Sequence, residues 1–172
     1  MASDRVATFE SQMLPHLPAA YTLASYLLRE RADAEDAVQE AYLQAIRHFG
    51  TFRGENARGW LLTIVRRVCY ALSDRVRRAG PAHDPAMALE IPTQEDDPAT
   101  TVERGELQER LARAVDALPG PFREVIILRE IQELSYNEIA GIVGVPVGTV
   151  MSRLARARRR LQVALEAQGM GG

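Results

Sequence analysis

Five arginines lie in the stretch VPVGTVMSRLARARRRL, residues 145–161, which contains neither a lysine nor an acid. Guanidinium groups bind phosphates and the acceptor edge of guanine, so such a run can hold a nucleic acid. The alternative is the solvated face of an ordinary amphipathic helix. Solvated faces usually mix both signs of charge, whereas no acid occurs between Glu138 and Glu166. We therefore favour a helix that binds nucleic acid.

The residues before this stretch predict a second, shorter helix. SYNE, at 135–138, fits a capping box in which Ser135 caps the Glu138 amide and Glu138 reaches back. The helix should run from about residue 135 to 143 and stop at Gly144, after which Val145-Pro146 turns the chain. Two short helices joined by a tight glycine turn, the second of them basic, form a helix-turn-helix.

The faces of the basic helix follow from placing its residues about 100° apart. One set forms a buried stripe: Val150, Leu154, Ala157 and Leu161. Another set points away from that stripe: Ser152, Ala155, Arg156 and Arg159. Arg153 and Arg160 lie on one flank, with Met151 and Arg158 on the other. We expect the outward residues to face base edges and the flanking arginines to reach phosphates.

Charge is unevenly distributed along the 172 residues, whose net charge is −2. Residues 1–80 carry net +2, residues 81–116 net −6, and residues 117–172 net +2. Residues 80–101 contain four prolines and five acids without periodicity, which is typical of a flexible linker. No segment outside it alternates like a strand. The sequence therefore predicts an all-α protein of two small helical domains, residues 5–79 and 102–168, joined by an acidic linker at 80–101.

Helical periodicity assigns faces in the first domain. A short apolar helix follows Pro18, and a second helix begins with Asp33 as its N-cap. Its predicted buried stripe is Val38, Ala41, Tyr42, Ala45, Ile46 and Phe49. Its opposite, polar face holds Glu35, Asp36, Gln39, Glu40 and Gln44. A third helix should run from about Ala57 to Arg78.

The third helix and the first helix of the second domain are also amphipathic. The third helix should bury Leu61, Ile64, Val65, Val68 and Leu72. Its other side carries Arg58, Arg66, Arg67, Tyr70, Asp74, Arg77 and Arg78. In the second domain Asp97 and Pro98 should open a helix. The buried stripe of that helix is predicted to be Leu107, Leu111, Ala114 and Leu118.

Composition argues against several other classes of protein. The single cysteine, Cys69, can form neither an internal disulfide nor a metal site alone, and its apolar neighbours predict a core position. Three scattered histidines and no glycine-rich phosphate loop argue against an enzyme, and we expect no cofactor and no metal. No apolar run is long enough for a membrane span and no signal pattern opens the chain, so we expect a soluble cytoplasmic protein.

Three segments together resemble an extracytoplasmic-function sigma factor, the minimal bacterial type. They are DAEDAVQEAYLQAI, FRGENARGWLLTIVRR and LPGPFREVIILREIQELSYNEIAGIVGVPVGTVMSRLARAR. The resemblance covers roughly residues 5–166, and LSYNEIAGIVGVPVGTVMSRLARAR, which resembles region 4, is its most specific piece. It implies a region 2 domain and a region 4 domain joined by a connector that threads the polymerase toward the RNA exit path.

The resemblance implies functional residues as well. Region 2.2 residues that would bind the β′ clamp helices of core RNA polymerase are Asp36, Gln39, Glu40 and Gln44. Residues that would contact the −10 element are Phe52, Arg53, Arg66, Arg67, Arg77 and Arg78. Residues that would contact the −35 element are Thr149, Ser152, Arg153, Arg156, Arg159 and Arg160. Further implied partners are the β flap, promoter DNA and an anti-sigma factor, and the free protein should be a monomer.

The sequence departs from the family pattern at three positions. Arg67 stands where members commonly have asparagine, at a position associated with a flipped −10 base, and arginine lacks an acceptor. Met151 stands where a basic residue is usual, and Ala155 is small. Since neither can hydrogen-bond a base, Ser152 and Arg156 should do more of the reading.

Two other functions fit part of the sequence. A free-standing helix-turn-helix regulator would explain the second domain but leave the polar face at 35–44 without a role. A sigma mimic that sequesters an anti-sigma factor usually carries a phosphoreceiver domain, for which this length leaves no room. We therefore expect an alternative sigma factor that directs promoter-specific initiation.

Overall fold

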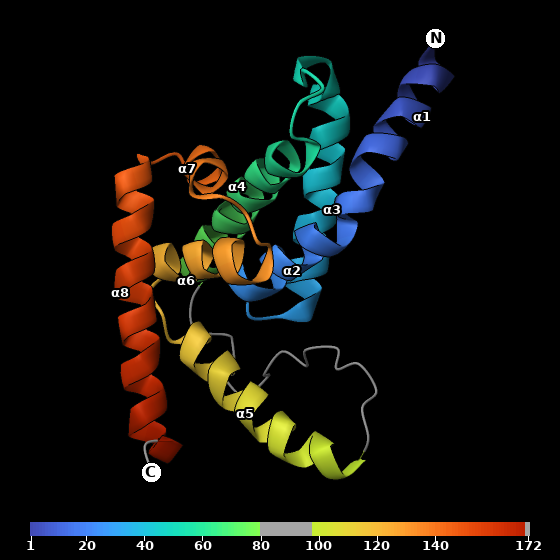
Figure 1. The fold of residues 1–172 in the computed structure, drawn as a ribbon. Helices are drawn as coiled ribbons and strands as arrows, with labels where there is room; N and C mark the ends of the chain where they lie inside the picture. Colours follow the sequence, from blue (N-terminus) through green and yellow to red (C-terminus); the bar gives the residue numbers. More distant parts are fainter. Residues whose placement is uncertain (80–97, 171–172) are drawn as a thin grey trace.

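The computed structural model describes residues 1–79 and 98–170, and within these ranges the chain folds into helices and turns without a strand. The α-helices are α1 (Ala2–Met13), α2 (Leu17–Leu27), α3 (Arg31–His48), α4 (Ala57–Arg78), α5 (Pro98–Asp116), α6 (Gly120–Ile126), α7 (Tyr136–Val143) and α8 (Val147–Leu165), as Figure 1 shows. A π-helical turn, Ile127–Ile131, continues α6. The prediction of an all-α fold is confirmed.

In the first half of the chain, α2 and α4 pack against α3. The buried face of α3 is made of small residues, Ala34, Ala37, Val38, Ala41 and Ala45, which allow neighbouring helices to approach closely. α4 spans the residues predicted for it. It begins where the Asn56 side chain accepts a hydrogen bond from the Gly59 amide at 3.1 Å.

Two predictions for α3 are wrong, and α1 had not been predicted. Ile46 is 51% exposed instead of buried, because it lies on the flank of α3 away from the alanine-rich face. The helix begins at Arg31, with Glu30 at its N-cap position, so Asp33 lies in the first turn and is not the cap. α1 buries only Phe9 and Met13, too few residues for a helical stripe to stand out in the sequence.

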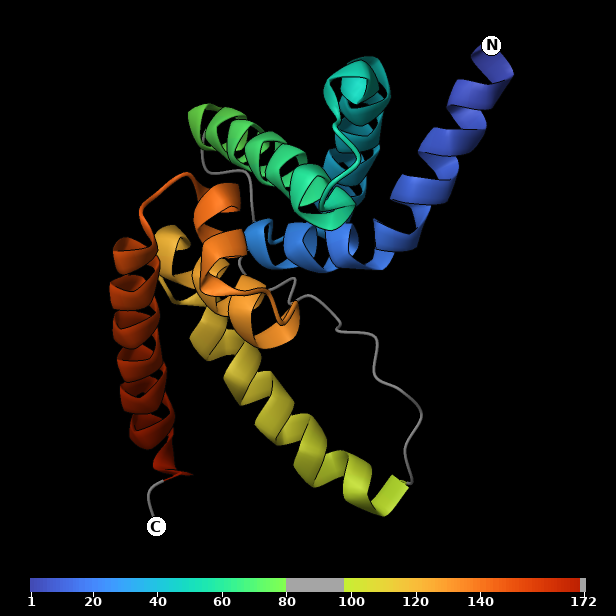
Figure 2. The same ribbon diagram turned by 45° about the horizontal axis from the view of Figure 1, so that its top comes forward.

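In the second half, Ala114 in α5 and Leu118, two residues after the end of α5, are buried as predicted. Leu107 and Leu111, by contrast, are 46% and 44% exposed, so the upstream half of the predicted stripe is wrong. In both views the beginning of α5 extends away from the other helices, so no other described helix packs closely against it (Figures 1 and 2). The predicted linker at 80–101 and the Asp97 cap lie outside the described residues, apart from residues 98–101, which open α5.

The helix-turn-helix is formed by α7 and α8. Ser135 caps α7 by accepting a hydrogen bond from the Glu138 amide at 3.1 Å. Gly144 ends the helix with a φ of 77°, and α8 starts directly after Pro146. Val150, Leu154 and Ala157 are buried, and Leu161 is half-buried. The local signals in the sequence therefore predicted both helices and the inward stripe of the second.

Gly144 offers a test of the turn, because its backbone conformation is one that L side chains rarely adopt. A Cβ at this position would meet no heavy atom within 4 Å, so the effect of Gly144→Ala is one of backbone strain alone. We expect it to lower the free energy of unfolding by about 1–2 kcal/mol in urea denaturation. Gly141 is the matched control, since it is helical and equally uncrowded. Gly141→Ala should raise the free energy of unfolding by up to about 1 kcal/mol. If both substitutions changed the free energy of unfolding in the same direction, the left-handed conformation of Gly144 would not explain its effect.

The two halves of the chain are docked against each other. α4 packs on α7, and α2 packs on α6 and on the π-helical turn that follows it. Figure 2 shows α2 lying beside these elements. The buried apolar cluster accordingly draws side chains from both halves, among them Leu23 and Val65 from the first and Ile127 and Ile139 from the second. The first half therefore presents one side of α4 to the second half instead of to solvent.

Candidate nucleic-acid and partner interfaces

The outward face of α8 combines one hydroxyl with free guanidinium groups. Ser152, Ala155, Arg156 and Arg159 are all exposed, opposite the buried Val150–Leu154–Ala157 stripe. The Ser152 hydroxyl donates a hydrogen bond to the carbonyl oxygen of Thr149 at 3.0 Å, and Thr149 itself is half-buried at the start of the helix. With its proton held by the backbone, the Ser152 oxygen is oriented to accept a hydrogen bond from outside.

Two flanking arginines of α8, Arg158 and Arg160, have partners within the second half. Arg158 pairs with Glu130 at 2.7 Å, and this hydrogen bond to the carboxylate raises the pKa of the arginine. The guanidinium of Arg160 lies 5.2 Å from the centre of the Phe122 ring, a cation–π distance. Arg153 is half-buried. The most freely presented charges of the helix are therefore those of Arg156 and Arg159.

The polar face of α3 is available to a partner. Asp36 and Gln39 are exposed, while Glu40 and Gln44 are half-buried and joined by a 3.2 Å hydrogen bond from the Gln44 amide to the Glu40 carboxylate. The structure adds two apolar residues to this surface, Leu43 at 50% and Ile46 at 51% exposure. Leu43 could have been found from the sequence, because it stands seven residues after Asp36 and thus on the same side of the helix.

The residues predicted for the −10 element are not equally exposed. Phe52 is half-buried, its ring 5.8 Å from that of Phe49 and 5.2 Å from that of Trp60, so the aromatic packing fixes the loop before α4. The remaining arginines other than Arg66 are exposed: Arg53, Arg67, Arg77 and Arg78. Arg77 forms an exposed ion pair with Asp74 at 3.1 Å.

Arg66 faces the second half of the protein. Its Nε and Nη2 atoms donate hydrogen bonds to the Glu124 carboxylate at 2.6 and 3.1 Å, and the Tyr70 hydroxyl donates a third at 3.0 Å. The Glu124 side chain is 1% exposed and that of Arg66 is 24% exposed. Although burial opposes it, the hydrogen bonds and charge of Glu124 raise the pKa of Arg66, while burial and Glu124 raise the pKa of Tyr70.

Sequence reasoning missed the role of Glu124. It is buried on α6 between the halves, and it appears in the sequence as one more acid in a charged segment. One signal was present: Glu124 stands three and four residues before the buried Ile127 and Leu128, so it shares an apolar face. A charge on such a face is normally paired, but the sequence does not name the partner.

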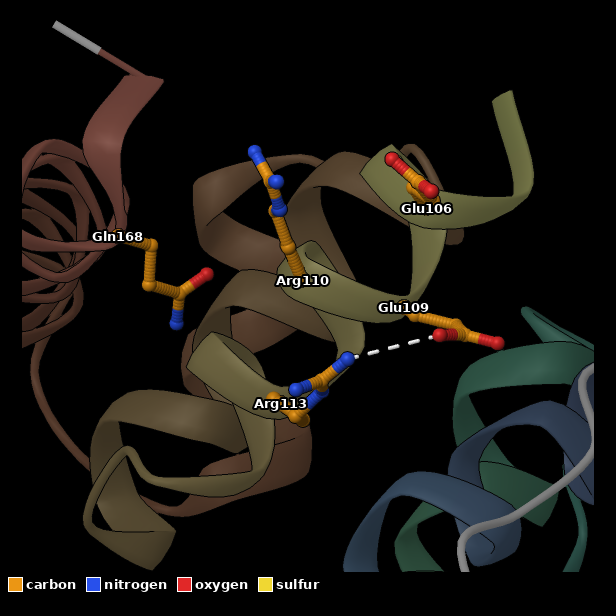
Figure 3. A pocket seen from close by; sticks show the side chains of 5 residues that line it. All are labelled: Glu106, Glu109, Arg110, Arg113 and Gln168. Carbon is orange, nitrogen blue, oxygen red and sulfur yellow. Dashed lines mark hydrogen bonds and ion pairs between the residues drawn. The ribbon is translucent and has the colours of Figure 1, made fainter. Parts of the chain in front are cut away.

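The surface also has an open pocket beside α5, and its lining does not indicate a catalytic site. Figure 3 shows its lining, which consists of four charged side chains of α5, namely Glu106, Glu109, Arg110 and Arg113, with Gln168 across from them. The Arg113–Glu109 pair, at 3.5 Å, is exposed and contributes little. Among the residues that the structure describes, no three His, Cys, Asp or Glu side chains are grouped so that they could hold a metal ion. Nor does any single described helix have the length and apolar character needed to cross a membrane.

Comparison with known proteins identifies both halves. The family described as Sigma-70 region 2 matches residues 13–80, and Sigma-70, region 4 matches residues 108–161. The ECF RNA polymerase sigma-E factor of Escherichia coli K12 is 36% identical over 138 residues, covering 75% of this chain and 72% of that protein. The ECF RNA polymerase sigma factor SigE of Mycolicibacterium smegmatis is 33% identical over 150 residues, covering 86% of this chain but only 57% of the relative.

Two solved structures are similar to this chain across both halves. The sigma factor RpoE of Bartonella quintana, in complex with the anti-sigma factor NepR, superposes with a TM-score of 0.77 and 30% identity, over 92% of this chain and 97% of that one. CnrH, in complex with the cytosolic domain of CnrY, superposes with a TM-score of 0.68 and 28% identity, over 92% and 88%. The two helical halves thus correspond to sigma regions 2 and 4. The chain belongs to the extracytoplasmic-function sigma factors of RNA polymerase, group 4 of the sigma-70 superfamily.

Proposed function

We propose that the chain is an alternative sigma factor that binds core RNA polymerase and directs initiation at a particular set of promoters, without itself being an enzyme. The observation that carries this proposal is that both halves match sigma regions in order, with a basic helix-turn-helix at the end of the second. Because RNA polymerase and promoter DNA lie in the bacterial cytoplasm, this function also places the protein there.

In this proposal three separate surfaces bind core polymerase, the −10 element and the −35 element. The polar face of α3 around Asp36, Gln39 and Glu40 binds the β′ clamp helices, and its exposed Leu43 supplies an apolar contact. The loop at Phe52 and the arginine-bearing side of α4 contact the −10 element. The outward face of α8 reads the −35 element while region 4 rests on the β flap.

An anti-sigma factor completes the set of partners. Support comes from the Bartonella RpoE structure, in which a sigma factor of this overall arrangement is in complex with the anti-sigma factor NepR. Such a partner would bind the free, monomeric protein and withhold it from core polymerase.

In vitro transcription tests the function directly. Purified protein, core RNA polymerase and a genomic fragment library should together give transcripts that start downstream of a shared sequence element, and core polymerase alone should not. A free-standing helix-turn-helix regulator would instead bind its DNA tightly without polymerase. Tight, specific binding by the protein alone, with no polymerase-dependent transcripts, would therefore refute the proposal.

Two arginines of α8 should differ in what they contribute. Arg156 points straight out of the helix, so Arg156→Ala should cost about 1–3 kcal/mol in promoter binding and relax the preference at one −35 position. Arg160 lies on a flank, so Arg160→Ala should weaken binding on all sequences alike and lower the salt-dependence slope by about one. Binding of a panel of −35 variants at several salt concentrations measures both effects. Equal, sequence-independent losses would contradict the assignment of Arg156.

A further inference from the structure

The docked halves of the protein are joined by a buried charge. The carboxylate of Glu124, on α6, accepts three hydrogen bonds, all from α4: two from Arg66 and one from Tyr70. The Arg66 guanidinium also lies 4.8 Å from the centre of the Tyr70 ring, so the two donors support each other. Arg66 and Glu124 are 58 residues apart in the chain, and their pairing requires the halves to be docked.

Among the described residues, three other hydrogen bonds between the halves each end on a backbone carbonyl oxygen. The Gln132 amide donates to Ala19 at 3.1 Å, Arg58 donates to Gln132 at 3.3 Å, and Arg123 donates to Tyr26 at 3.5 Å. If the halves separate, each of these groups can be hydrated and none is left buried without a partner. The interface also buries apolar side chains from both halves, so the free energy of closing combines apolar burial with these polar contacts.

Arg66 lies on the side of α4 that, in the proposed function, faces the −10 element. The guanidinium fork binds a carboxylate and a phosphate in the same two-pronged geometry. While Glu124 holds the fork, Arg66 cannot bind a DNA phosphate, and α7 covers part of α4 as well. Glu124 therefore occupies the place that a backbone phosphate would take.

We propose that Glu124 is an internal phosphate mimic that closes region 4 onto region 2, so that the free protein is autoinhibited by its own second half. This inference rests on the proposed function. Bartonella RpoE has a similar overall arrangement, but in a complex with an anti-sigma factor, whereas here the contact between Glu124 and Arg66 lies within the chain itself. Core polymerase and promoter must then break the Glu124–Arg66 pair before region 2 can act. The apparent affinity of the protein for them equals the affinity of the open form multiplied by the fraction of molecules that are open.

Glu124→Gln tests the proposal, because it removes the charge but keeps the shape and leaves Arg66 free for DNA. In small-angle X-ray scattering the variant should have a larger radius of gyration than the parent. In transcription from the promoter recovered with core polymerase, the protein concentration for half-maximal transcript should fall on the order of tenfold. Tyr70→Phe, which removes only one of the three hydrogen bonds, should give a smaller change in the same direction and serves as the second variant if Glu124→Gln does not fold.

Glu109→Gln is the matched control. Glu109 also pairs with an arginine, Arg113, at 3.5 Å, but both residues lie on the exposed surface of α5 and in none of the proposed binding surfaces. Its substitution should therefore change neither the radius of gyration nor the half-maximal protein concentration. An unchanged radius for Glu124→Gln and Tyr70→Phe would refute the closing contact. A larger radius with an unchanged half-maximal concentration would refute autoinhibition. A parent protein that gives no promoter-specific transcript refutes the proposed function instead, and the scattering result still decides whether Glu124 closes the halves.

Discussion

Replacing Gln39 and Glu40 together by alanine should leave the protein folded but prevent it from joining core RNA polymerase. Both side chains lie on the solvent side of α3, opposite its alanine-rich buried face. Surface substitutions of this kind usually change the free energy of unfolding by less than about 0.5 kcal/mol. If this face binds the clamp helices, losing two central polar contacts should weaken core binding by more than about tenfold, or 1.4 kcal/mol. Thermal melting and a titration of core polymerase measure the two effects separately.

The double variant Gln162→Ala, Glu166→Ala is the matched control for this experiment. These residues are also a glutamine and a glutamate on an exposed helical surface, joined by a 3.1 Å hydrogen bond, but Gln162 lies in the last turn of α8 and Glu166 directly follows that helix. This control should bind core polymerase as the parent does. Normal core binding by the α3 variant, or its unfolding, would show that the face of α3 has been misassigned.

Much of the fold could be predicted from the sequence because its signals are local. The capping serine at 135, the glycine at 144 and the three- and four-residue spacing in α8 each act within a few residues of where they stand. The same is true of α4, whose bounds matched the prediction. The predicted set of outward α8 residues is likewise a matter of helical angle, and the structure places these residues on the exposed side of the helix.

Apart from the start of α3 and the unpredicted α1, the errors concern what lies next to a helix instead of within it. Leu107, Leu111 and Ile46 fit an apolar stripe, but the described elements leave them about half exposed. Conversely, the arginine-bearing side of α4 was expected to face outward, and α6 and α7 cover part of it. Periodicity describes one helix at a time and does not encode which faces meet.

The contact between Glu124 and Arg66 is the clearest case. An acid beside an arginine in a charged segment looks like a surface residue, and its true partner is 58 positions away. Only the docking of the two halves brings the pair together, and the sequence leaves that docking open. Consequently Arg66 could be assigned to DNA from its position on α4, whereas its competing partner could not be named.

The second large effect is expected when Arg66 is replaced by methionine. This change leaves the Glu124 carboxylate without its two strongest donors in a buried place, and breaking a buried ion pair in this way costs about 3–5 kcal/mol. The protein can avoid part of that cost by separating its halves, since this hydrates Glu124. We therefore expect a loss of stability in urea denaturation that is limited by the free energy of docking, together with a larger radius of gyration.

Adding Glu124→Met to Arg66→Met should reverse both changes. Two apolar side chains of similar volume can fill the interface without a buried charge, and such replacements are often neutral or stabilising. Each single substitution leaves a group of the other half unpaired, whereas the double variant leaves neither, so the effects should be strongly non-additive. Glu124→Met alone should cost less than Arg66→Met alone, because the Arg66 side chain is 24% exposed and can reach water, while Glu124 at 1% cannot. Losses that simply add in the double variant would mean that the two residues do not hold the halves together through each other.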